Sequence, residues 1–86
     1  MPQDNFLEVK ILWPPAAQKE SFQGKIKAIS SKNRLGNFDI LPGHANFISL
    51  IFNTLVVHAP DKKINYQFKR GVLEVSGNKV KIFLGL

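Results

Sequence analysis

Apolar and polar residues alternate along much of the chain with the two-residue period that is typical of half-buried β-strands. The first alternating segment spans residues 7–13 and ends at Pro14 and Pro15, which cannot donate hydrogen bonds to a neighbouring strand. A second alternating segment spans residues 21–28, and the polar residues 30–34 that follow it predict a turn. The N-terminal third of the chain is therefore predicted to form two strands.

The C-terminal half of the chain repeats this pattern of short strands and turns. We expect strands over residues 47–51, 54–58, 64–68, 72–76 and 79–84. We expect turns over residues 52–53, 59–62, 69–71 and 77–78, the last being a two-residue loop that is typical of a β-hairpin. No window shows the 3.6-residue period of a helix with capping residues. The chain is therefore predicted to be all-β with no substantial helix, a sandwich or barrel that forms a single domain over residues 1–86.

Composition supports a folded domain and excludes several kinds of site. Hydrophobic residues make up 44% of the chain and include seven Phe, which argues against disorder. The absence of cysteine excludes a disulfide scaffold, a thiolate zinc site and a cysteine nucleophile. No apolar run approaches the roughly 20 residues of a membrane-spanning helix, and the N-terminus does not resemble a signal peptide. We therefore expect a soluble cytosolic domain.

The chain is basic, with a net charge of +6, and this raises the question of a nucleic-acid partner. The lysines are spread along the chain and often occupy alternate positions, as Lys25 and Lys27 or Lys79 and Lys81 do. Alternation of this kind is typical of strands that expose one face to solvent. Solvated strand faces are thus the simpler interpretation, and a basic nucleic-acid-binding β-barrel remains the alternative.

The aromatic residues bear on the same choice. A binder of single-stranded nucleic acid interleaves exposed aromatic and basic side chains on one face of a sheet. Tyr66 and Phe68 alternate with polar residues and are expected to point into the core. Phe83 is the best candidate for an exposed aromatic side chain, and a single such residue indicates a protein contact more than a base-stacking platform.

Residues 35–47, L-G-N-F-D-I-L-P-G-H-A-N-F, concentrate turn formers, large apolar residues and a histidine. Gly36, Pro42 and Gly43 are expected to set the backbone geometry of a rigid corner. Phe38 supplies an apolar anchor, and His44 is one of only two histidines in the chain. The segment is therefore the first place to look for functional residues.

Catalysis by this segment would need an acid–base pair. Asp39 and His44 lie across a turn from each other, and a small hydrolase could use them with a nucleophile such as Ser49. A histidine beside Pro-Gly in a loop is more often a structural or contact group, because a catalytic site needs several convergent residues. His58 is likewise interpreted as structural or solvent-facing. Two histidines without cysteine make a weak metal site, and no phosphate-binding glycine loop is present, so no cofactor or metal is expected.

Three motifs in the same order resemble the epsilon subunit of F-type ATP synthase, which is named delta in mitochondria. Residues 36–45 resemble its signature G-x-[FL]-G-[IV]-[LY]-P-G-H-A. Residues 21–26 resemble its second strand, x-F-x-G-x-[IV], and residues 70–80 resemble its closing G-x-[LV]-E-V hairpin. Two positions depart from the signature: Asn37 stands where many members carry Glu, and Asp39 stands where Gly is usual.

The resemblance implies a fold and a role. It implies a ten-stranded β-sandwich that serves as a non-catalytic rotor subunit in the central stalk of the synthase. Such a subunit couples the gamma subunit to the membrane c-ring during proton- or sodium-driven ATP synthesis. The implied partners are the gamma subunit, the polar loops of the c-ring and, in the assembled complex, the catalytic beta subunits, with no nucleic acid. The implied location is peripheral, on the cytoplasmic side of the bacterial plasma membrane.

The resemblance also implies site residues at the contact between rotor and c-ring. Carried over by position, they are Gly36, Asn37, Phe38, Pro42, Gly43 and His44. Family members usually continue into two C-terminal helices that regulate the enzyme, whereas this sequence ends at Leu86, just after the last predicted strand. On this basis the chain is expected to lack the helical autoinhibitory region.

Overall fold

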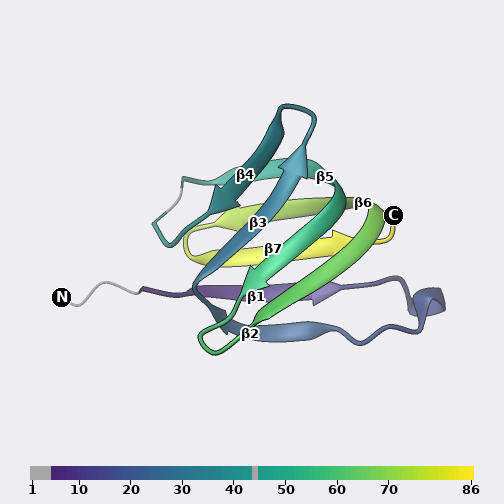
Figure 1. Ribbon diagram of the computed structural model, residues 1–86, viewed down its shortest axis with the longest axis horizontal. Helices are drawn as coiled ribbons and strands as arrows, with labels where there is room; N and C mark the ends of the chain where they lie inside the picture. The colour runs from purple at the N-terminus through teal and green to yellow at the C-terminus, as the bar shows by residue number, and fades with distance from the viewer. Residues whose placement is uncertain (1–4, 44) are drawn as a thin grey trace.

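The computed structural model describes residues 5–43 and 45–86, and in this part of the chain the fold is all-β, as predicted (Figure 1). It contains seven strands: β1 (Leu7–Leu12), β2 (Phe22–Ile26), β3 (Ala28–Asn33), β4 (Gly36–Ile40), β5 (Phe47–His58), β6 (Lys63–Ser76) and β7 (Lys79–Leu84). The helical content of the described residues is a single 3-10 turn, η1 (Pro15–Ala17). The resemblance implied ten strands, and this number is wrong for residues 5–43 and 45–86, which form seven.

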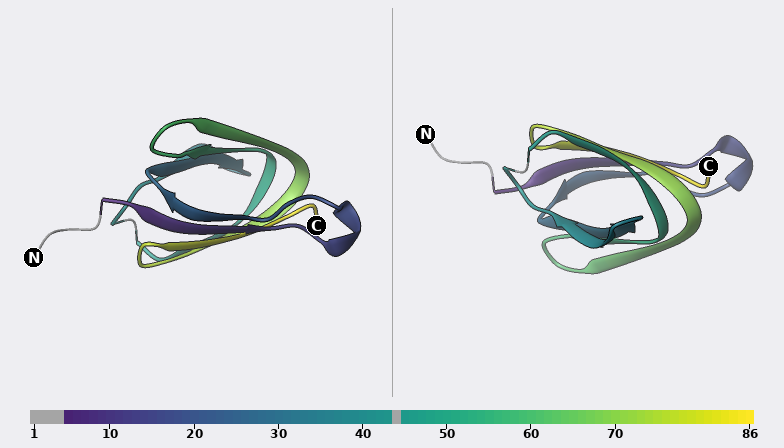
Figure 2. Two further views of the ribbon diagram at one scale, coloured as in Figure 1. Left: turned by 90° about the horizontal axis from the view of Figure 1, so that it is seen from below. Right: turned by 90° about the horizontal axis from the view of Figure 1, so that it is seen from above.

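All seven strands belong to one hydrogen-bonded sheet in the order β2-β1-β7-β6-β5-β3-β4. Strands β1 and β7 run parallel, and the other neighbouring pairs are antiparallel. The sheet folds over on itself, so that two layers face each other (Figure 2). The first layer contains β2, β1 and β7 with residues 47–52 of β5 and 71–76 of β6. The second layer contains β3 and β4 with the remaining parts of β5 and β6.

The layers are joined by bends inside β5 and β6, each of which the alternation pattern had divided into two shorter strands. The register of β5 on β6 shifts between Phe52 and Thr54, and Asn53 adopts a left-handed φ of 73°. This is the geometry of a β-bulge, which bends a strand without ending it. Strand β6 bends between the layers (Figure 1), its pairing with β7 in the first layer begins at Gly71, and Gly71 is buried. The turns predicted at residues 52–53 and 69–71 are therefore bends within continuous strands.

Two predictions for residues 28–40 are also wrong. The polar residues 30–34 were expected to form a turn, but β3 continues to Asn33 and the turn is limited to residues 34–35. Polar residues are tolerated in β3 because one face of this strand meets solvent. Ser31 is buried on the other face, and its hydroxyl donates a hydrogen bond to the carbonyl of Thr54 (2.7 Å). Part of the expected corner is a strand as well, since β4 pairs with β3 along its whole length.

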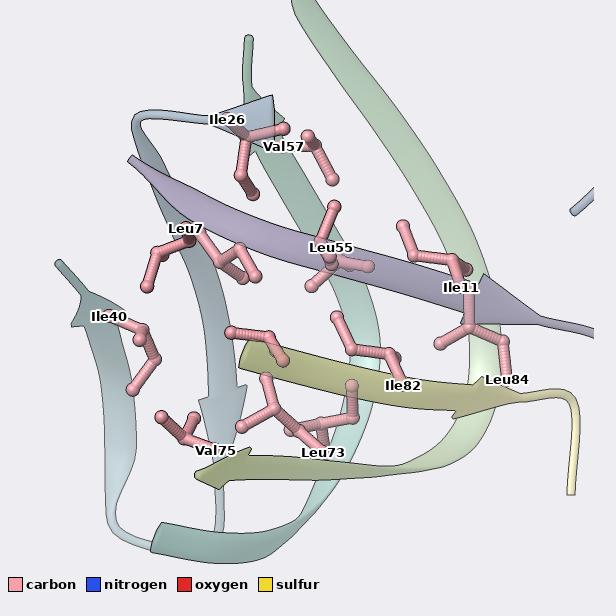
Figure 3. Close-up of a cluster of buried hydrophobic side chains, with 14 residues drawn as sticks. Leu7, Ile11, Ile26, Ile40, Leu55, Val57, Leu73, Val75, Ile82 and Leu84 are labelled. Atoms are coloured by element: carbon pink, nitrogen blue, oxygen red, sulfur yellow. The ribbon is translucent and has the colours of Figure 1, made fainter. Parts of the chain in front are cut away.

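The core lies between the two layers and is aliphatic (Figure 3). Every strand contributes to it: Leu7, Val9, Ile11, Ile26, Ile29, Ile40, Ile51, Leu55, Val57, Leu73, Val75, Val80, Ile82 and Leu84. These residues occupy alternate positions in their strands, as the two-residue period predicted. Tyr66 and Phe68 pack against this core, which confirms their predicted orientation. The predicted hairpin loop at residues 77–78 is confirmed too, because Ser76 and Lys79 pair across it.

The bend in β6 generates a stability prediction. A Cβ atom at Gly71 would lie 2.6 Å from the backbone carbonyl oxygen of Phe83, so Gly71→Ala must displace backbone in the centre of the sheet. We expect this substitution to lower the free energy of unfolding by about 2–3 kcal/mol in chemical denaturation. Gly24→Ala is the matched control, because a Cβ there would meet the Phe22 ring at an ordinary 3.6 Å. Equal stability of the two variants would contradict this account of the bend.

Candidate functional site

The loop between β4 and β5, residues 41–46, is tied to the β6–β7 hairpin by two asparagine side chains. The backbone N–H of Gly43 donates to Oδ1 of Asn78 (2.8 Å), and the N–H of Gly77 donates to Oδ1 of Asn46 (3.0 Å). The carbonyl of Asn78 in turn accepts the N–H of Glu8 at the start of β1 (2.8 Å). Segments that are far apart in sequence are thus held together at one end of the molecule.

Glycine is required in this loop for a conformational reason. Gly43 has a φ of 84°, in the left-handed region that is strained for residues with a Cβ atom. No atom lies within 4 Å of a Cβ built at this position, so the requirement comes from the backbone conformation and not from crowding. Pro42 precedes it and is half-buried. Together Pro42 and Gly43 fix the backbone directly after β4, at an exposed end of the sandwich.

The structure divides the six residues predicted from the resemblance into separate groups. Gly36 and Asn37 begin β4, next to the β3–β4 turn, whereas Pro42 and Gly43 follow its other end. Asn37 and Pro42 are five positions apart in sequence, which corresponds to roughly 16 Å at the rise of an extended strand. His44 lies outside the described residues. The predicted set therefore does not form one compact site in the part of the chain that is described.

Phe38 serves a packing role between these two groups. Its ring is half-buried and lies against Phe47 at the start of β5, with the ring centroids 5.6 Å apart and the planes at 62°. Both rings pack against the aliphatic core. This edge-to-face contact is a favourable arrangement for aromatic pairs, and it joins β4 to β5 across the intervening loop. Phe38 thus anchors the segment that presents Pro42 and Gly43.

A surface that the sequence analysis largely missed lies on the outer face of the first layer. Here four apolar side chains form what we call the apolar strip: Ile48, Leu50, Val72 and Phe83. Leu50, Val72 and Phe83 stand side by side in register on β5, β6 and β7, and Ile48 lies two residues from Leu50 on the same face. The exposed fractions are 67% for Ile48, 46% for Leu50 and 37% for Phe83.

The strip continues into an apolar hollow of about 370 Å³ beside Phe83. Its lining is almost entirely hydrophobic: Leu12, Trp13, Pro14, Phe83, Leu84 and Leu86. The indole N–H of Trp13 is buried without a hydrogen-bond partner among the described residues, and the ammonium of Lys19 lies 4.5 Å from the centre of the indole ring. Phe83, which was predicted to be exposed, is therefore confirmed as part of a larger apolar surface.

The sequence did contain a signal for the strip. Residues 47–52, F-I-S-L-I-F, are apolar at five of six positions and do not alternate. A continuous apolar run in a strand puts hydrophobic side chains on both of its faces. Because Ile51 is buried in the core, Ile48 and Leu50 point outward. The run predicted a strand correctly, and its apolar residues on the solvent-facing side were the signal for the strip.

A second cluster of chemically relevant side chains lies on the outer face of the second layer. The hydroxyl of Ser30 on β3 donates to Oδ1 of Asp39 on β4 (2.6 Å), and its oxygen lies 2.9 Å from Nε2 of His58 on β5. Because the serine proton is directed to the carboxylate, the imidazole donates to the serine oxygen and is not its base. These residue types resemble a hydrolytic triad, but their connectivity is that of a cross-strand structural network.

The residues required by the hydrolase hypothesis are not brought together. Asp39 lies on β4 and Ser49 on β5, and β3 separates these strands in the sheet. The Ser49 hydroxyl donates to the carbonyl of Leu50 (2.9 Å) instead.

Among the described residues, no group of three or more His, Cys, Asp or Glu side chains could hold a metal ion. Burial raises the pKa of the Tyr66 phenol above its ordinary value of 10.0.

The described residues contain no helix that is long and apolar enough to cross a membrane.

The aromatic side chains of the described residues do not form the row of exposed rings on which a nucleic-acid-binding domain would stack bases. Phe83 is the one aromatic residue among the exposed large hydrophobic side chains of the described part, and its neighbours in the sheet are Val72 and Leu12. Apolar neighbours of this kind indicate a protein contact.

Comparison with known proteins gives a consistent result. Residues 7–84 match the family model described as ATP synthase, Delta/Epsilon chain, beta-sandwich domain. The chain is 33% identical over 82 residues to the ATP synthase epsilon chain of Clostridium botulinum strain Eklund 17B, covering 93% of this chain and 58% of that one. It is 30% identical over 78 residues to the ATP synthase epsilon chain of Clostridium kluyveri, covering 88% and 57%. The chain thus spans somewhat more than half the length of these relatives.

Two solved structures share the fold. A chain of the Euglena gracilis mitochondrial ATP synthase, in a structure of OSCP, F1 and c-ring, superposes with a TM-score of 0.82 at 20% identity, covering 98% of this chain and 53% of that one. A chain from the central stalk and c-ring of the Tetrahymena thermophila mitochondrial ATP synthase superposes with a TM-score of 0.76 at 12% identity, covering 100% and 67%. At these identities, the likeness supports the β-sandwich architecture alone.

The hydrogen bonds that Asn46 and Asn78 accept between the β4–β5 loop and the β6–β7 hairpin, which we call the asparagine clamp, can be tested directly. Asn78→Ala removes the acceptor for the Gly43 N–H, and we expect it to lower the free energy of unfolding by about 1 kcal/mol. Amide hydrogen exchange should show faster exchange at Gly43, with the core strands unaffected. Asn65→Ala is the matched control, because the Asn65 side chain is exposed and has no hydrogen bond among the described residues. Unchanged exchange at Gly43 in Asn78→Ala would disprove the clamp.

Proposed function

The chain belongs to the delta/epsilon chain family of ATP synthase through the family's β-sandwich domain, and on this premise we propose that it is a central-stalk rotor subunit of an F-type ATP synthase. In this role the domain couples the gamma subunit to the membrane c-ring and catalyses nothing itself. Its position is peripheral, on the cytoplasmic side of the bacterial plasma membrane. The clostridial relatives, which are ATP synthase epsilon chains, support this placement.

The apolar strip is the observation that carries the proposal. Monomeric soluble proteins rarely expose several large apolar side chains side by side, and such a patch marks a protein contact. Ile48, Leu50 and Phe83 are exposed on a rigid sheet, so their positions are set before any partner arrives. Pre-formed apolar anchors reduce the entropic cost of binding. We assign the gamma subunit to this strip.

The construction of the sandwich suits a part that transmits force. Each of its seven strands is hydrogen-bonded to a neighbour, and β5 and β6 pass through both layers. Shearing one layer against the other would therefore have to break a continuous backbone or disrupt the close-packed aliphatic core. A domain built in this way resists deformation under torque, which is the mechanical requirement for coupling a ring to a shaft.

We further propose that the β4–β5 loop meets the polar loops of the c-ring. Leu41 and Gly43 are exposed in the loop, and hydrogen bonds join Gly43 to Asn78 and Asn46 to Gly77. Pro42, Gly43 and His44 would belong to this contact. Gly36 and Asn37, at the other end of β4, would reach only a second part of the ring surface.

A charge placed in the strip tests the gamma assignment. Leu50→Lys should weaken binding to the purified gamma subunit of the same synthase at least tenfold in isothermal titration calorimetry, because docking would bury an unpaired ammonium. Asn65→Lys adds the same charge to the exposed outer face of the second layer and should bind as the wild type does. Thermal unfolding of both variants shows whether they remain folded.

Two results would count against the proposed function. A wild-type domain that does not bind gamma would refute the rotor assignment itself. A folded Leu50→Lys variant that binds gamma with wild-type affinity would leave the rotor role standing but would place the contact on another surface.

A further inference from the structure

A basic depression adjoins the apolar strip on the same outer face. Its volume is about 550 Å³, and it extends over β2, β1, β7 and the C-terminal part of β6. Six charged side chains line what we call the lysine trough: Lys10, Lys25, Lys79, Lys81, Glu8 and Glu74. None of the six forms an ion pair with another described residue. Four ammonium groups and two carboxylates leave the trough with an excess of positive charge.

The sheet register shows where this excess is concentrated. The charged residues form two cross-strand rows, each with two lysines and one glutamate: Lys25–Glu8–Lys79 and Lys10–Lys81–Glu74. In the second row Lys10 and Lys81 stand directly opposite each other on the parallel strands β1 and β7. Like charges at directly opposite positions repel each other and destabilise a sheet. Among the described residues of this row, Glu74 is the one carboxylate, and it lies on the Lys81 side of the pair.

The trough and the strip are continuous. Glu74, at the edge of the trough, is directly opposite Ile48 of the strip. Lys81 precedes Phe83 by two residues and therefore lies on the same face of β7. Neighbouring rows on one face of a sheet are about 7 Å apart, so a partner surface of ordinary size that covers Phe83 also covers Lys81.

We propose that the lysine trough binds acidic side chains of the protein that docks on the apolar strip. The argument rests on the proposed function, in which that partner is the gamma subunit. A partner that covers Lys10 and Lys81 must pair their ammonium groups, because an unpaired charge in a buried interface is costly. The docking surface of gamma is therefore apolar at its centre and carries carboxylates on the side that faces β1.

Charge pairs of this type act mainly on the rate of association. Complementary charges steer the encounter of two proteins, and added salt screens the effect. We expect the double variant Lys10→Gln/Lys81→Gln to associate with gamma about tenfold more slowly than the wild type at roughly 20 mM salt. The difference should largely vanish at roughly 300 mM salt, where screening acts over only a few ångströms.

The control variant removes the same charge elsewhere. Lys62→Gln/Lys63→Gln takes two exposed lysines from the β5–β6 turn, which belongs to the second layer and does not line the trough. Stopped-flow association with gamma should be within twofold of the wild type for this control. The comparison separates a local role of the trough from the effect of net charge.

The outcomes are distinguishable. If both double variants slow association equally, or if neither does, the trough has no specific role and the inference is wrong, although the rotor assignment stands. If the wild type does not bind gamma, the proposed function fails and the inference fails with it. If the trough binds pyrophosphate in calorimetry, gamma does not displace it, and Lys10→Gln/Lys81→Gln abolishes this binding, the trough is a small-anion site and the inference is overturned.

Discussion

The fold depends on two long strands that bend without breaking. Strands β5 and β6 carry a single sheet from one layer to the other, and the aliphatic core exists only because they turn over it (Figure 2). The bend in β6 needs a residue without a Cβ atom, because the carbonyl oxygen of Phe83 occupies the space where Gly71 would otherwise carry one. At the bend in β5, Asn53 adopts a left-handed φ and faces two residues of β6, Phe68 and Lys69, so the extra residue of the bulge lies on β6. One steric constraint and one local backbone conformation therefore decide that the chain forms a two-layer sandwich and not a flat sheet.

The same bends organise the surface. Because side chains alternate along a strand, folding the sheet onto its apolar face turns the other face outward in both layers. On the first layer this outer face carries Ile48, Leu50 and Phe83 beside the lysine-rich depression. On the second layer it carries the polar network centred on Ser30. The two outer faces thus differ in chemistry, which gives the domain one side suited to a protein partner and one side suited to solvent.

Local residue patterns predicted the buried strand faces and the β6–β7 hairpin, but they did not predict features that depend on which strands pair with each other. Alternation at Leu7, Val9 and Ile11 was enough to identify a buried face, and Gly77–Asn78 was enough to identify a hairpin. The pattern divided β5 and β6 into two strands each, because a turn and a bulge have the same local composition and only the partner strand distinguishes them. The count of ten strands came from the family resemblance and not from this pattern. The motif with Pro42 and Gly43 identified the family. It could not show that Gly36 and Gly43 lie near opposite ends of an extended strand, because β4 is defined by its pairing with β3.

The central claim is that the outer face of the first layer is the docking surface, and thiol protection tests it most directly. The chain contains no cysteine, so a single one can be placed without background reactivity. Leu50→Cys lies in the strip, and Asn65→Cys lies on the outer face of the other layer. Saturating gamma subunit should slow modification of Leu50→Cys by a maleimide at least tenfold and leave Asn65→Cys unchanged. Protection of Asn65→Cys with Leu50→Cys still fully reactive would contradict the account.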